Sequence, residues 1–468
     1  MGRTSLFLII GFNLTFMFMG FRLATSASAA YQKYCDYLDI EQAGLAMESC
    51  ANIAISHSLL DTARSNTIIM FTSQTLFNKT GSSFTLTQYP LYDPLSPSVQ
   101  IGESLKVTGT YPLAGSSNYL SDTTFVRVTG NSFSQYVFYS VNEGGIQWLN
   151  NEICWGRYHT QDNLYVNGNP DFKGKVTTKK GLSLMSGTPQ FEQGITKADI
   201  SIPAHLDQLT NYGSTLAGGA YYQGVDTYVQ FMDDGHVVVR AASVGTSPAT
   251  VWGYTSATAG SVSDGAGGPS VPKYQVFNSA AALASSGVLL VQDAALHVKG
   301  ELNGKITLGC IDSQTGGTKS QVWIDSSIAY ASAVGVPSPP PSYQYPGNVS
   351  NSMLGIVATN TVTVSQNINH DNTKAQLNNL TLNASIFSQT SGFCAENAGT
   401  RTPGLLHLVG GLQQLTRGLV TQNGKGFTKD YDWDKNLAAG SPKGYPSTPF
   451  VVQNWIDLTT IPPDFWDN

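Results

Sequence analysis

The sequence predicts a mainly β protein with a long N-terminal helix, a small antiparallel β subdomain and a right-handed parallel β-helix (solenoid) with inserted loops. Short β-branched segments recur between Gly, Asn and Asp turns, for example at 288–291, 296–299 and 305–308. Stacked β-repeats have this pattern. Only 12% of the residues are charged, against about 25% in typical soluble domains. Such a low charged fraction is typical of exported β-rich proteins. One uncharged apolar segment opens the chain.

Three parts make up the expected domain organisation. Residues 1–65 are a membrane anchor with an amphipathic helix, or a signal peptide. Residues 66–134 form the small β subdomain. Residues 135–468 form the solenoid, with insertions near 185–272 and 336–350; the second insertion is rich in Pro, which cannot join a ladder. A chain of 468 residues exceeds one ordinary core, but a stacked repeat can grow lengthwise.

The N-terminal segment from Thr4 to Phe21 carries no charge. As a helix it would span ~27 Å, close to the ~30 Å hydrocarbon core of a bilayer. We therefore expect a single membrane crossing. Arg3 precedes the segment and Ala27-Ser28-Ala29 follows it as an A-x-A site, so a cleaved secretory signal peptide is the competing interpretation.

Apolar residues continue at steps of three and four from Ile40 to Ala54, which predicts that the helix extends to about Ser65. An apolar half joined to an amphipathic half resembles the build of a type IV pilin-like subunit. On one unbroken helix Cys35 and Cys50 would lie roughly 22 Å apart at ~1.5 Å per residue, beyond the ~4.4–6.8 Å that a disulfide allows. The five cysteines include no Cys-x-x-Cys pair, so no zinc or redox motif is indicated.

Strand patterns then follow along the chain. Four of them predict the small antiparallel sheet, at 67–71, 83–87, 104–109 and 124–129. Further on, 228–231 and 236–240 flank an Asp-Gly turn and predict a hairpin. Residues 193–215 allow one short helix, which Pro203 limits in length. Residues 241–272 are rich in Gly, Ser and Ala and predict a loop.

His159 and Asp162 are the first candidate polar site. A carboxylate beside an imidazole orients and charges it, as an acid–base pair requires. The simpler interpretation, which we favour, is a polar turn at a solenoid corner, because this run of polar side chains satisfies backbone groups without any substrate.

Asp233, Asp234, His236 and Arg240 are the second candidate site. A β-helix polysaccharide hydrolase or lyase uses paired carboxylates for acid–base chemistry, or an Arg as base. The Asp-Gly hairpin turn explains the two acids more simply, and the even spacing of His236 and Arg240 predicts that both line a solvated face.

Asp430, Asp432 and Asp434 alternate like the opening of a calcium loop and are weak metal candidates. Lys435 stands where that loop needs Gly, and Ser441 where it needs a bidentate Glu. Strand alternation predicts instead that the three carboxylates share one exposed face. No catalytic motif and no cofactor motif is found.

Aromatic side chains are the last candidates, because exposed rings can stack on sugars, although such rings more often cap a hydrophobic core. They are Trp148, Trp155, Trp252, Trp433, Tyr343 and Tyr345. The net charge of −6 is spread without a basic run, which argues against nucleic acid as a partner.

Four blocks resemble an uncharacterised bacterial family of membrane-anchored, secreted, pilin-like β-solenoid proteins: Trp155 to Thr178, Gly287 to Tyr330, Met353 to Ala358, and Leu405 to Pro446. The resemblance implies an envelope-exposed solenoid that serves as a pilus or secretion accessory, and it implies no reaction. We therefore expect a membrane-anchored, extracytoplasmic structural or interaction protein of the bacterial envelope. Its expected partners are the membrane, pilus or secretion proteins, or a second copy. The alternatives are a β-helix carbohydrate-active enzyme and a glycan-binding surface protein.

Overall fold

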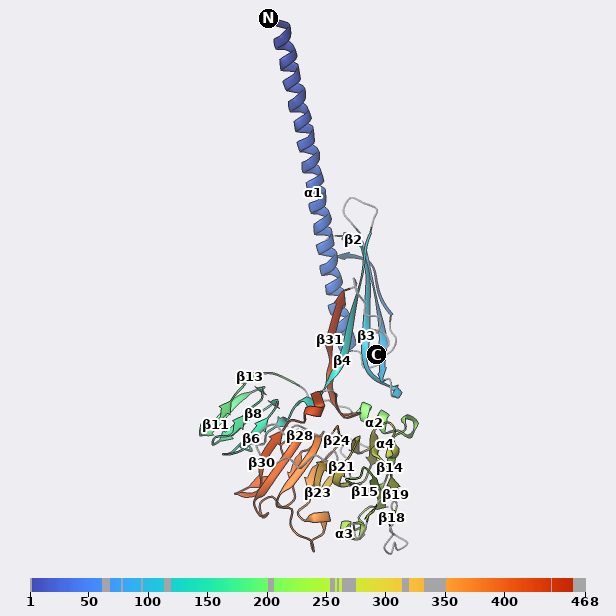
Figure 1. The fold of residues 1–468 in the computed structure, drawn as a ribbon, viewed down its shortest axis with the longest axis vertical. Coiled ribbons are helices and arrows are strands. Elements are labelled where there is room, and N and C mark those ends of the chain that lie inside the picture. The colour runs from blue at the N-terminus through green and yellow to red at the C-terminus, as the bar shows by residue number, and fades with distance from the viewer. Residues whose placement is uncertain are drawn as a thin grey trace. The chain divides into compact units, whose positions relative to one another are not determined.

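The structure is a computed structural model that describes residues 2–60, 68–76, 79–93, 96–112, 119–200, 206–252, 257–258, 261–262, 275–313, 320–331, 351–438 and 440–457. The chain is mainly β, with one long N-terminal helix and a small antiparallel sheet (Figure 1). It divides into two compact units. The first comprises Met1–Tyr92, Gln100–Thr129 and Phe450–Asn468, and the second comprises Asp93–Val99 and Gly130–Pro449. The predicted loop at 336–350 lies outside the described residues.

Helix α1 (Gly2–Leu60) is continuous, which confirms the predicted long helix as far as Leu60. No Pro interrupts its sequence. Large apolar side chains of its first half are exposed, among them Phe7 at 71%, Met17 at 75% and Leu23 at 77%. Ala51, near its end, is fully buried. The first half of α1 therefore presents apolar surface that the other described residues of the first unit do not cover.

The antiparallel sheet of the first unit has five strands in the order β1-β2-β3-β4-β31. They are β1 (Ile68–Leu76), β2 (Lys79–Asp93), β3 (Ser96–Pro112), β4 (Tyr119–Ser132) and β31 (Ser447–Asp457). In β3, Leu105 and Val107 are buried while Lys106 between them is partly exposed, as expected for a sheet with one covered face. The predicted small sheet is thus confirmed. Its fifth strand comes from the end of the chain, which the sequence-based division had placed within 135–468.

Residues 138–197 of the second unit form three parallel ladders. The first contains β5 (Phe138–Asn142), β7 (Tyr158–Thr160), β10 (Val176–Thr178) and β13 (Ile195–Lys197). The second contains β6 (Ile153–Trp155), β9 (Asp171–Phe172) and β12 (Gln190–Phe191), and the third contains β8 (Asn163–Asn167) and β11 (Gly181–Ser186). In the first ladder Phe138 pairs with Tyr158, Tyr158 with Val176, and Val176 with Ile195. The chain therefore returns to the same ladder every 18 to 20 residues.

Residues 220–416 form two further series of parallel strands. One contains β14 (Ala220–Gln223), β20 (Val288–Gln292), β22 (Lys305–Ile311), β24 (Met353–Ala358), β26 (Leu380–Ser388) and β28 (Gly404–Thr416). The other contains β15 (Val225–Phe231), β21 (Leu296–Leu302), β23 (Val322–Tyr330), β25 (Val362–Val364) and β27 (Phe393–Ala395). Three of these strands contain the predicted segments 288–291, 296–299 and 305–308, which are confirmed as strands.

Strand β28 joins the two regions, because it pairs with β26, with β5 and with β30 (Lys425–Asp432). Leu412 lies opposite Phe138, and β30 continues the stack to β6. The first strands of the unit therefore follow β28 in the stack, so the order in space differs from the order in sequence. Figure 1 shows β28 beside β30 and β21 beside β23. The described strands form no closed sheet.

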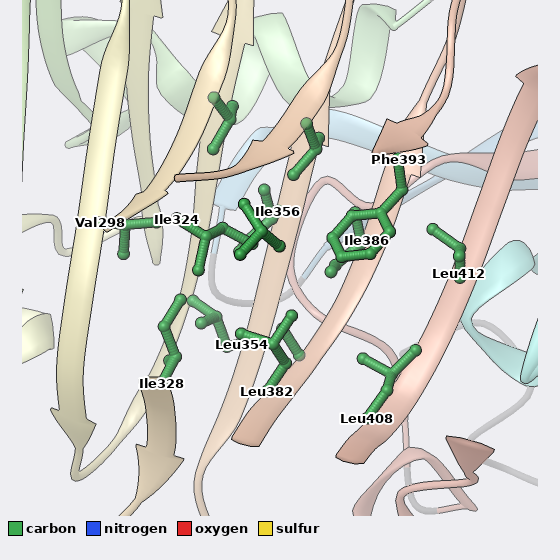
Figure 2. Close-up of a cluster of buried hydrophobic side chains, with 14 of the residues drawn as sticks. Val298, Ile324, Ile328, Leu354, Ile356, Leu382, Ile386, Phe393, Leu408 and Leu412 are labelled. Carbon is green, nitrogen blue, oxygen red and sulfur yellow. The ribbon is translucent and has the colours of Figure 1, made fainter. Parts of the chain in front are cut away.

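Aliphatic side chains fill the space between the ladders, as Figure 2 shows. Parallel register places Val298 opposite Ile324 and Ile356 opposite Ile386, and all four are fully buried. Because the pairing is in register, side chains of one kind stack along the unit, and alternate positions of each strand face outward.

Insertions interrupt the ladders. The predicted hairpin is confirmed, since β16 (Val237–Ser243) pairs antiparallel with β15 and then with β19 (Gln275–Phe277). The predicted loop 241–272 is wrong for its first part. Strand β16 continues to Ser243, because it still pairs with β15, and a helical turn follows.

The short elements are α2 (Asp207–Gly213), α3 (Pro248–Val251), α4 (Ala280–Leu283), η1 (Phe133–Gln135), η2 (Thr215–Ala217), η3 (Ile368–His370), η4 (Lys435–Ala438), β17 (Ala257–Thr258), β18 (Ser261–Val262) and β29 (Thr421–Gln422). Helix α2 is the short helix expected within 193–215.

Candidate functional site

Two clusters of His and Asp side chains lie on outward-facing positions of the second unit. One consists of His407, Asp430 and Asp432, and the other of His297, Asp325 and His370. Within each cluster, one nitrogen or carboxylate oxygen from every residue lies within 4.8 Å of the others. We call them the His407 cluster and the His297 cluster.

Strand alternation and parallel register build the His407 cluster. Leu406 and Leu408 point into the core of the second unit, so His407 between them faces outward. Its register partner on β30 is Asp430, and His407 Nδ1 lies 2.9 Å from Asp430 Oδ2. Asp432 occupies the next outward position of β30 and is only 6% exposed.

Burial and neighbouring groups shift the pKa values of Asp432 and His407. Burial raises the pKa of Asp432 to about 6, and the charge of Asp430 adds to this effect. The hydrogen bond with Asp430 raises the pKa of His407. The cluster offers one imidazole nitrogen and several carboxylate oxygens to a cation.

Asp434 does not join this cluster. Strand β30 ends at Asp432, so the alternation that pairs Asp430 with Asp432 does not extend to Asp434. Its side chain is 1% exposed, and Asp434 Oδ1 accepts the Asn436 N–H at 2.8 Å. The prediction that three carboxylates share one exposed face is therefore wrong for Asp434, and Asp432 is buried rather than exposed.

The His297 cluster is built around the fully buried carboxylate of Asp325. This carboxylate accepts hydrogen bonds from Trp252 Nε1 at 2.6 Å and Ser365 Oγ at 2.6 Å, and it pairs with His297 Nδ1 at 2.8 Å. Burial alone would raise the pKa of Asp325, but His297 and the hydrogen-bond donors outweigh it and lower the pKa. Both oxygens of Asp325 thus already have hydrogen-bond partners. We therefore interpret this cluster as one that stabilises the fold.

Aromatic rings enclose the His297 cluster. The His297 ring stacks on Tyr228 with centroids 4.3 Å apart, and His370 lies against Trp323 at the same centroid distance. Tyr228, His297 and Trp323 are register partners on β15, β21 and β23. The rings therefore form a row along the stack, and each one covers part of the next.

Lys299 lies beside this row. Its Nζ is 3.9 Å from the centroid of the Trp252 ring and donates to Asn369 Oδ1 at 2.6 Å. Burial lowers the pKa of Lys299 to about 8. The cation–π contact stabilises the charged form in this partly desolvated position.

His159 and Asp162 do not form the candidate acid–base pair, and the favoured interpretation of a polar turn is wrong for His159, which lies in a strand. His159 lies on strand β7, where its Nδ1 is 2.8 Å from Thr177 Oγ1, and burial lowers its pKa to about 4. Asp162 instead pairs with Lys180 at 2.7 Å and accepts the Glu143 N–H at 3.3 Å. At neutral pH the imidazole is therefore uncharged and is held within the stack.

The four hairpin residues do not form one cluster, although His236 Nδ1 lies 3.0 Å from Asp234 Oδ1. Asp234 Oδ1 accepts the His236 N–H at 3.0 Å across the turn, beside the exposed Asp233. Arg240 is only 5% exposed and donates to the Val251 carbonyl at 2.8 Å. The expectation that His236 and Arg240 line a solvated face is wrong for Arg240, because the insertion that contains α3 covers it.

Two buried ion pairs were not predicted. Glu143 pairs with Arg417 at 2.5 Å and Glu152 with Lys429 at 2.5 Å, and none of the four side chains is more than 4% exposed. Burial lowers the pKa of Lys429 to about 8 although Glu152 opposes this shift. Local patterns could not reveal these pairs, because Glu143 and Arg417 are 274 residues apart.

A cavity of about 680 Å³ lies in the second unit near the first rungs. Its lining includes Tyr136, Trp433, Arg157 and Lys175, together with the amides of Gln135 and Gln193. The described lining contains aromatic, cationic and amide groups, and it contains no carboxylate.

The other aromatic candidates divide by burial. Trp148 and Trp252 are buried, whereas Trp155 and Trp433 are partly exposed. Tyr343 and Tyr345 lie outside the described residues.

Fold and sites together define a mainly β protein of parallel ladders with one apolar N-terminal helix. Comparisons with protein families, with curated protein sequences and with solved structures found no match.

Sequence reasoning missed His297 and His407 as cluster members, although a usable signal was present. Each stands between two aliphatic residues, in Leu296-His297-Val298 and Leu406-His407-Leu408. In a strand with a buried face, this pattern places the imidazole on the outward face. The acid that meets it lies on a neighbouring strand and is found only once the register is known.

Proposed function

We propose that this protein is a membrane-anchored scaffold of the bacterial envelope that presents a right-handed parallel β-solenoid outside the cytoplasm, in the manner of a pilin-like assembly component. The observation that carries the proposal is the uncovered apolar surface on the first half of α1. No reaction is assigned.

The anchor follows from the composition of α1. The helical span Thr4–Cys35 has 32 residues, and its most apolar 18-residue window has a mean hydropathy of 1.8 and no buried part. Such a helix is ~48 Å long, which exceeds the ~30 Å hydrocarbon core. Exposure of apolar surface to water costs about 25 cal/mol per Å², so a bilayer or another apolar partner is the favoured environment. A signal peptide has the same composition, and the experiment below separates the two.

The proposed solenoid is supported by the regular return of the chain in residues 138–197. Ile153 pairs with Asp171 and Asp171 with Gln190 in the second ladder, which gives the same spacing as the first ladder. In the third, Trp148 bridges to Val166, which pairs with Leu184. Three ladders with one common repeat are what a coil with three faces produces.

An assembly role is supported by the last rung of this repeat. Strand β11 pairs with β8, and among the described strands it has no other neighbour. Its side chains Leu182, Leu184 and Met185 are 40%, 50% and 63% exposed. An open edge with exposed apolar side chains favours addition of a strand from another chain. A second copy or an envelope protein would fit this edge.

Cell fractionation, with mass spectrometry of the mature N-terminus, tests the proposal. We expect the protein in the membrane fraction with an N-terminus at Met1, as a plain anchor, or at Arg3, as a processed pilin-like subunit. A soluble protein that begins at Ala30 would show a cleaved signal peptide and contradict the anchor.

Binding of an acidic glycan is the second candidate function. The specific observation is the cavity near the first rungs, where Tyr136 and Trp433 offer ring faces and Arg157 and Lys175 offer positive charge. Its volume of about 680 Å³ lies within the roughly 300–1,000 Å³ of ligand pockets. With no carboxylate among the described lining residues, the cavity favours binding over glycoside hydrolysis, which uses paired carboxylates.

Calorimetric titration with an oligogalacturonate, an acidic oligosaccharide, tests this second function. We expect saturable binding that Trp433→Ala weakens about tenfold through loss of ring stacking. Tyr221→Ala, at a partly exposed tyrosine away from the cavity lining, is the matched control and should bind like the wild type. Equal binding by all three proteins would place the glycan elsewhere.

A further inference from the structure

We propose that His407, Asp430 and Asp432 form a binding site for a divalent transition metal ion. This site goes beyond the proposed scaffold function and does not depend on it. The three side chains come from two adjacent parallel strands, β28 and β30, and face the same outward side. One donor atom from each lies within 4.8 Å of the other two.

The second observation that points to a ligand is an unsatisfied carboxylate oxygen. Asp432 is 94% buried, since its exposed fraction is 6%. Its Oδ1 is buried and has no hydrogen-bond partner among the described residues, and the same holds for Asp430 Oδ1. Native proteins rarely leave buried polar atoms without a partner, and such an exception calls for an explanation such as a bound ion. A cation between the carboxylates would supply the missing partner for both oxygens.

The donor set indicates the class of ion. One imidazole nitrogen with carboxylate oxygens suits Zn²⁺ or Mn²⁺, whereas Ca²⁺ prefers oxygen donors alone. Metal–ligand bonds of about 2.0–2.2 Å keep any two donors within about 4.4 Å of each other. The three donor atoms lie within 4.8 Å of one another, so small rotations of the side chains bring them within this limit. The strands that hold the side chains are paired on both sides, which fixes their backbones.

An ion can enter the site from solvent. The side chain of His407 is 29% exposed and that of Asp430 is 16% exposed. Lys429, the nearest cation in sequence, points to the interior and pairs with Glu152, so it does not occupy the site. The outer face therefore carries two acids with one imidazole as their partner.

The His297 cluster provides a built-in comparison. It also brings one carboxylate and two imidazoles within 4.8 Å, but its carboxylate already has donors on both oxygens, from Trp252, His297 and Ser365. A metal ion there would have to displace hydrogen bonds in a buried position. We therefore expect the ion at the His407 cluster, and His370→Gln is the matched control variant.

Titration of the full-length protein in detergent micelles tests the proposal. After treatment with a chelator, the protein is titrated with ZnCl₂ and separately with MnCl₂ by calorimetry. The wild type and His370→Gln should bind one ion per chain. His407→Gln and Asp432→Asn should bind at least about tenfold more weakly, because each removes one ligand. Circular dichroism without metal checks that each variant is folded.

The proposal is wrong if the wild type binds neither ion with a stoichiometry near one, or if His370→Gln loses binding while His407→Gln keeps it. If His407→Gln or Asp432→Asn fails to fold, X-ray absorption of the Zn²⁺-loaded wild type decides. A single imidazole ligand with oxygen donors supports the His407 cluster. Two imidazole ligands would place the ion at the His297 cluster and overturn the proposal.

Discussion

Glu143 and Arg417 meet in the interior of the second unit, where their side chains are 0% and 2% exposed. The guanidinium also lies 5.0 Å from the centroid of the Trp148 ring. A buried ion pair adds little net stability, but loss of one partner leaves the other charge uncompensated. Both residues are therefore needed in the folded state, because the pairing of β28 with β5 brings the two side chains together in the interior.

Arg417→Ala should lower the free energy of unfolding by about 3–5 kcal/mol, because the buried carboxyl of Glu143 then loses its ion-pair partner. Urea denaturation followed by circular dichroism measures the loss. Lys179→Ala is the control, because Lys179 forms an exposed ion pair with Asp199, and it should leave stability nearly unchanged. Equal effects of the two substitutions would contradict the buried pair.

His159 predicts a dependence of stability on acid. Its pKa is about 4 in the folded protein, because of burial, against about 6.5 for a histidine exposed to solvent. The unfolded chain therefore binds the proton first as the pH falls, so the contribution of His159 is complete above about pH 6.5 and is lost towards pH 4. At about 1.4 kcal/mol per pKa unit, the loss reaches about 2 kcal/mol at pH 5.

Urea unfolding at pH 8 and pH 5, for the wild type and His159→Gln, isolates this effect, because the other titrating groups cancel in the difference. The variant should lose less stability than the wild type between the two pH values. If both lose the same amount, His159 is not buried in its neutral form.

At the scale of elements, the parallel ladders depend on aliphatic side chains that stack in register. Ile356 on β24 lies opposite Ile386 on β26, and both are fully buried (Figure 2). Ile356→Ala should lower the free energy of unfolding by about 2–5 kcal/mol through lost burial and the cavity left behind. Val244→Ala, at a side chain that is 58% exposed, should change it by less than about 0.5 kcal/mol. Chemical denaturation of both variants checks the contrast.

Corners between the rungs depend on close approach of the backbone. A Cβ on Gly174 would lie 2.0 Å from the Gly156 carbonyl oxygen, one rung away, whereas a Cβ on Gly440 would meet nothing within 4 Å. Gly174→Ala should therefore lower the thermal unfolding midpoint, since the corner must shift, and Gly440→Ala should not. Equal midpoints in a thermal scan would argue against this packing of the corners.

Elements were predictable from the sequence where their pattern is local. The continuous helix, the strands around 104–109 and 296–299, and the Asp-Gly hairpin all follow from periodicity and turn residues. Pairing across long distances was not predictable. Neither the stacking of Leu412 on Phe138 nor the position of β31 in the first sheet has a local signature. The His407 cluster was half predicted, because Asp430 and Asp432 stand out in sequence whereas His407 joins them only through register.

For the whole molecule, we propose that α1 determines location. Its 32-residue apolar span, Thr4–Cys35, is the feature by which the chain would be held at a membrane. A chain without residues 2–35 should leave the membrane fraction while it keeps the circular dichroism of its β-rich part. Sedimentation of membranes, with the full-length chain as control, measures this change, and an unchanged distribution would show that α1 is not the anchor.

We propose that a membrane helix holds a β-rich scaffold outside the cytoplasm. Protease treatment of intact spheroplasts, followed by detection of the C-terminal half in the membrane pellet, is the decisive test. We predict that the β-rich part is membrane-bound and is cleaved without lysis. Protection from the protease until the cells are lysed, or recovery of the intact chain in the soluble fraction, would contradict the claim.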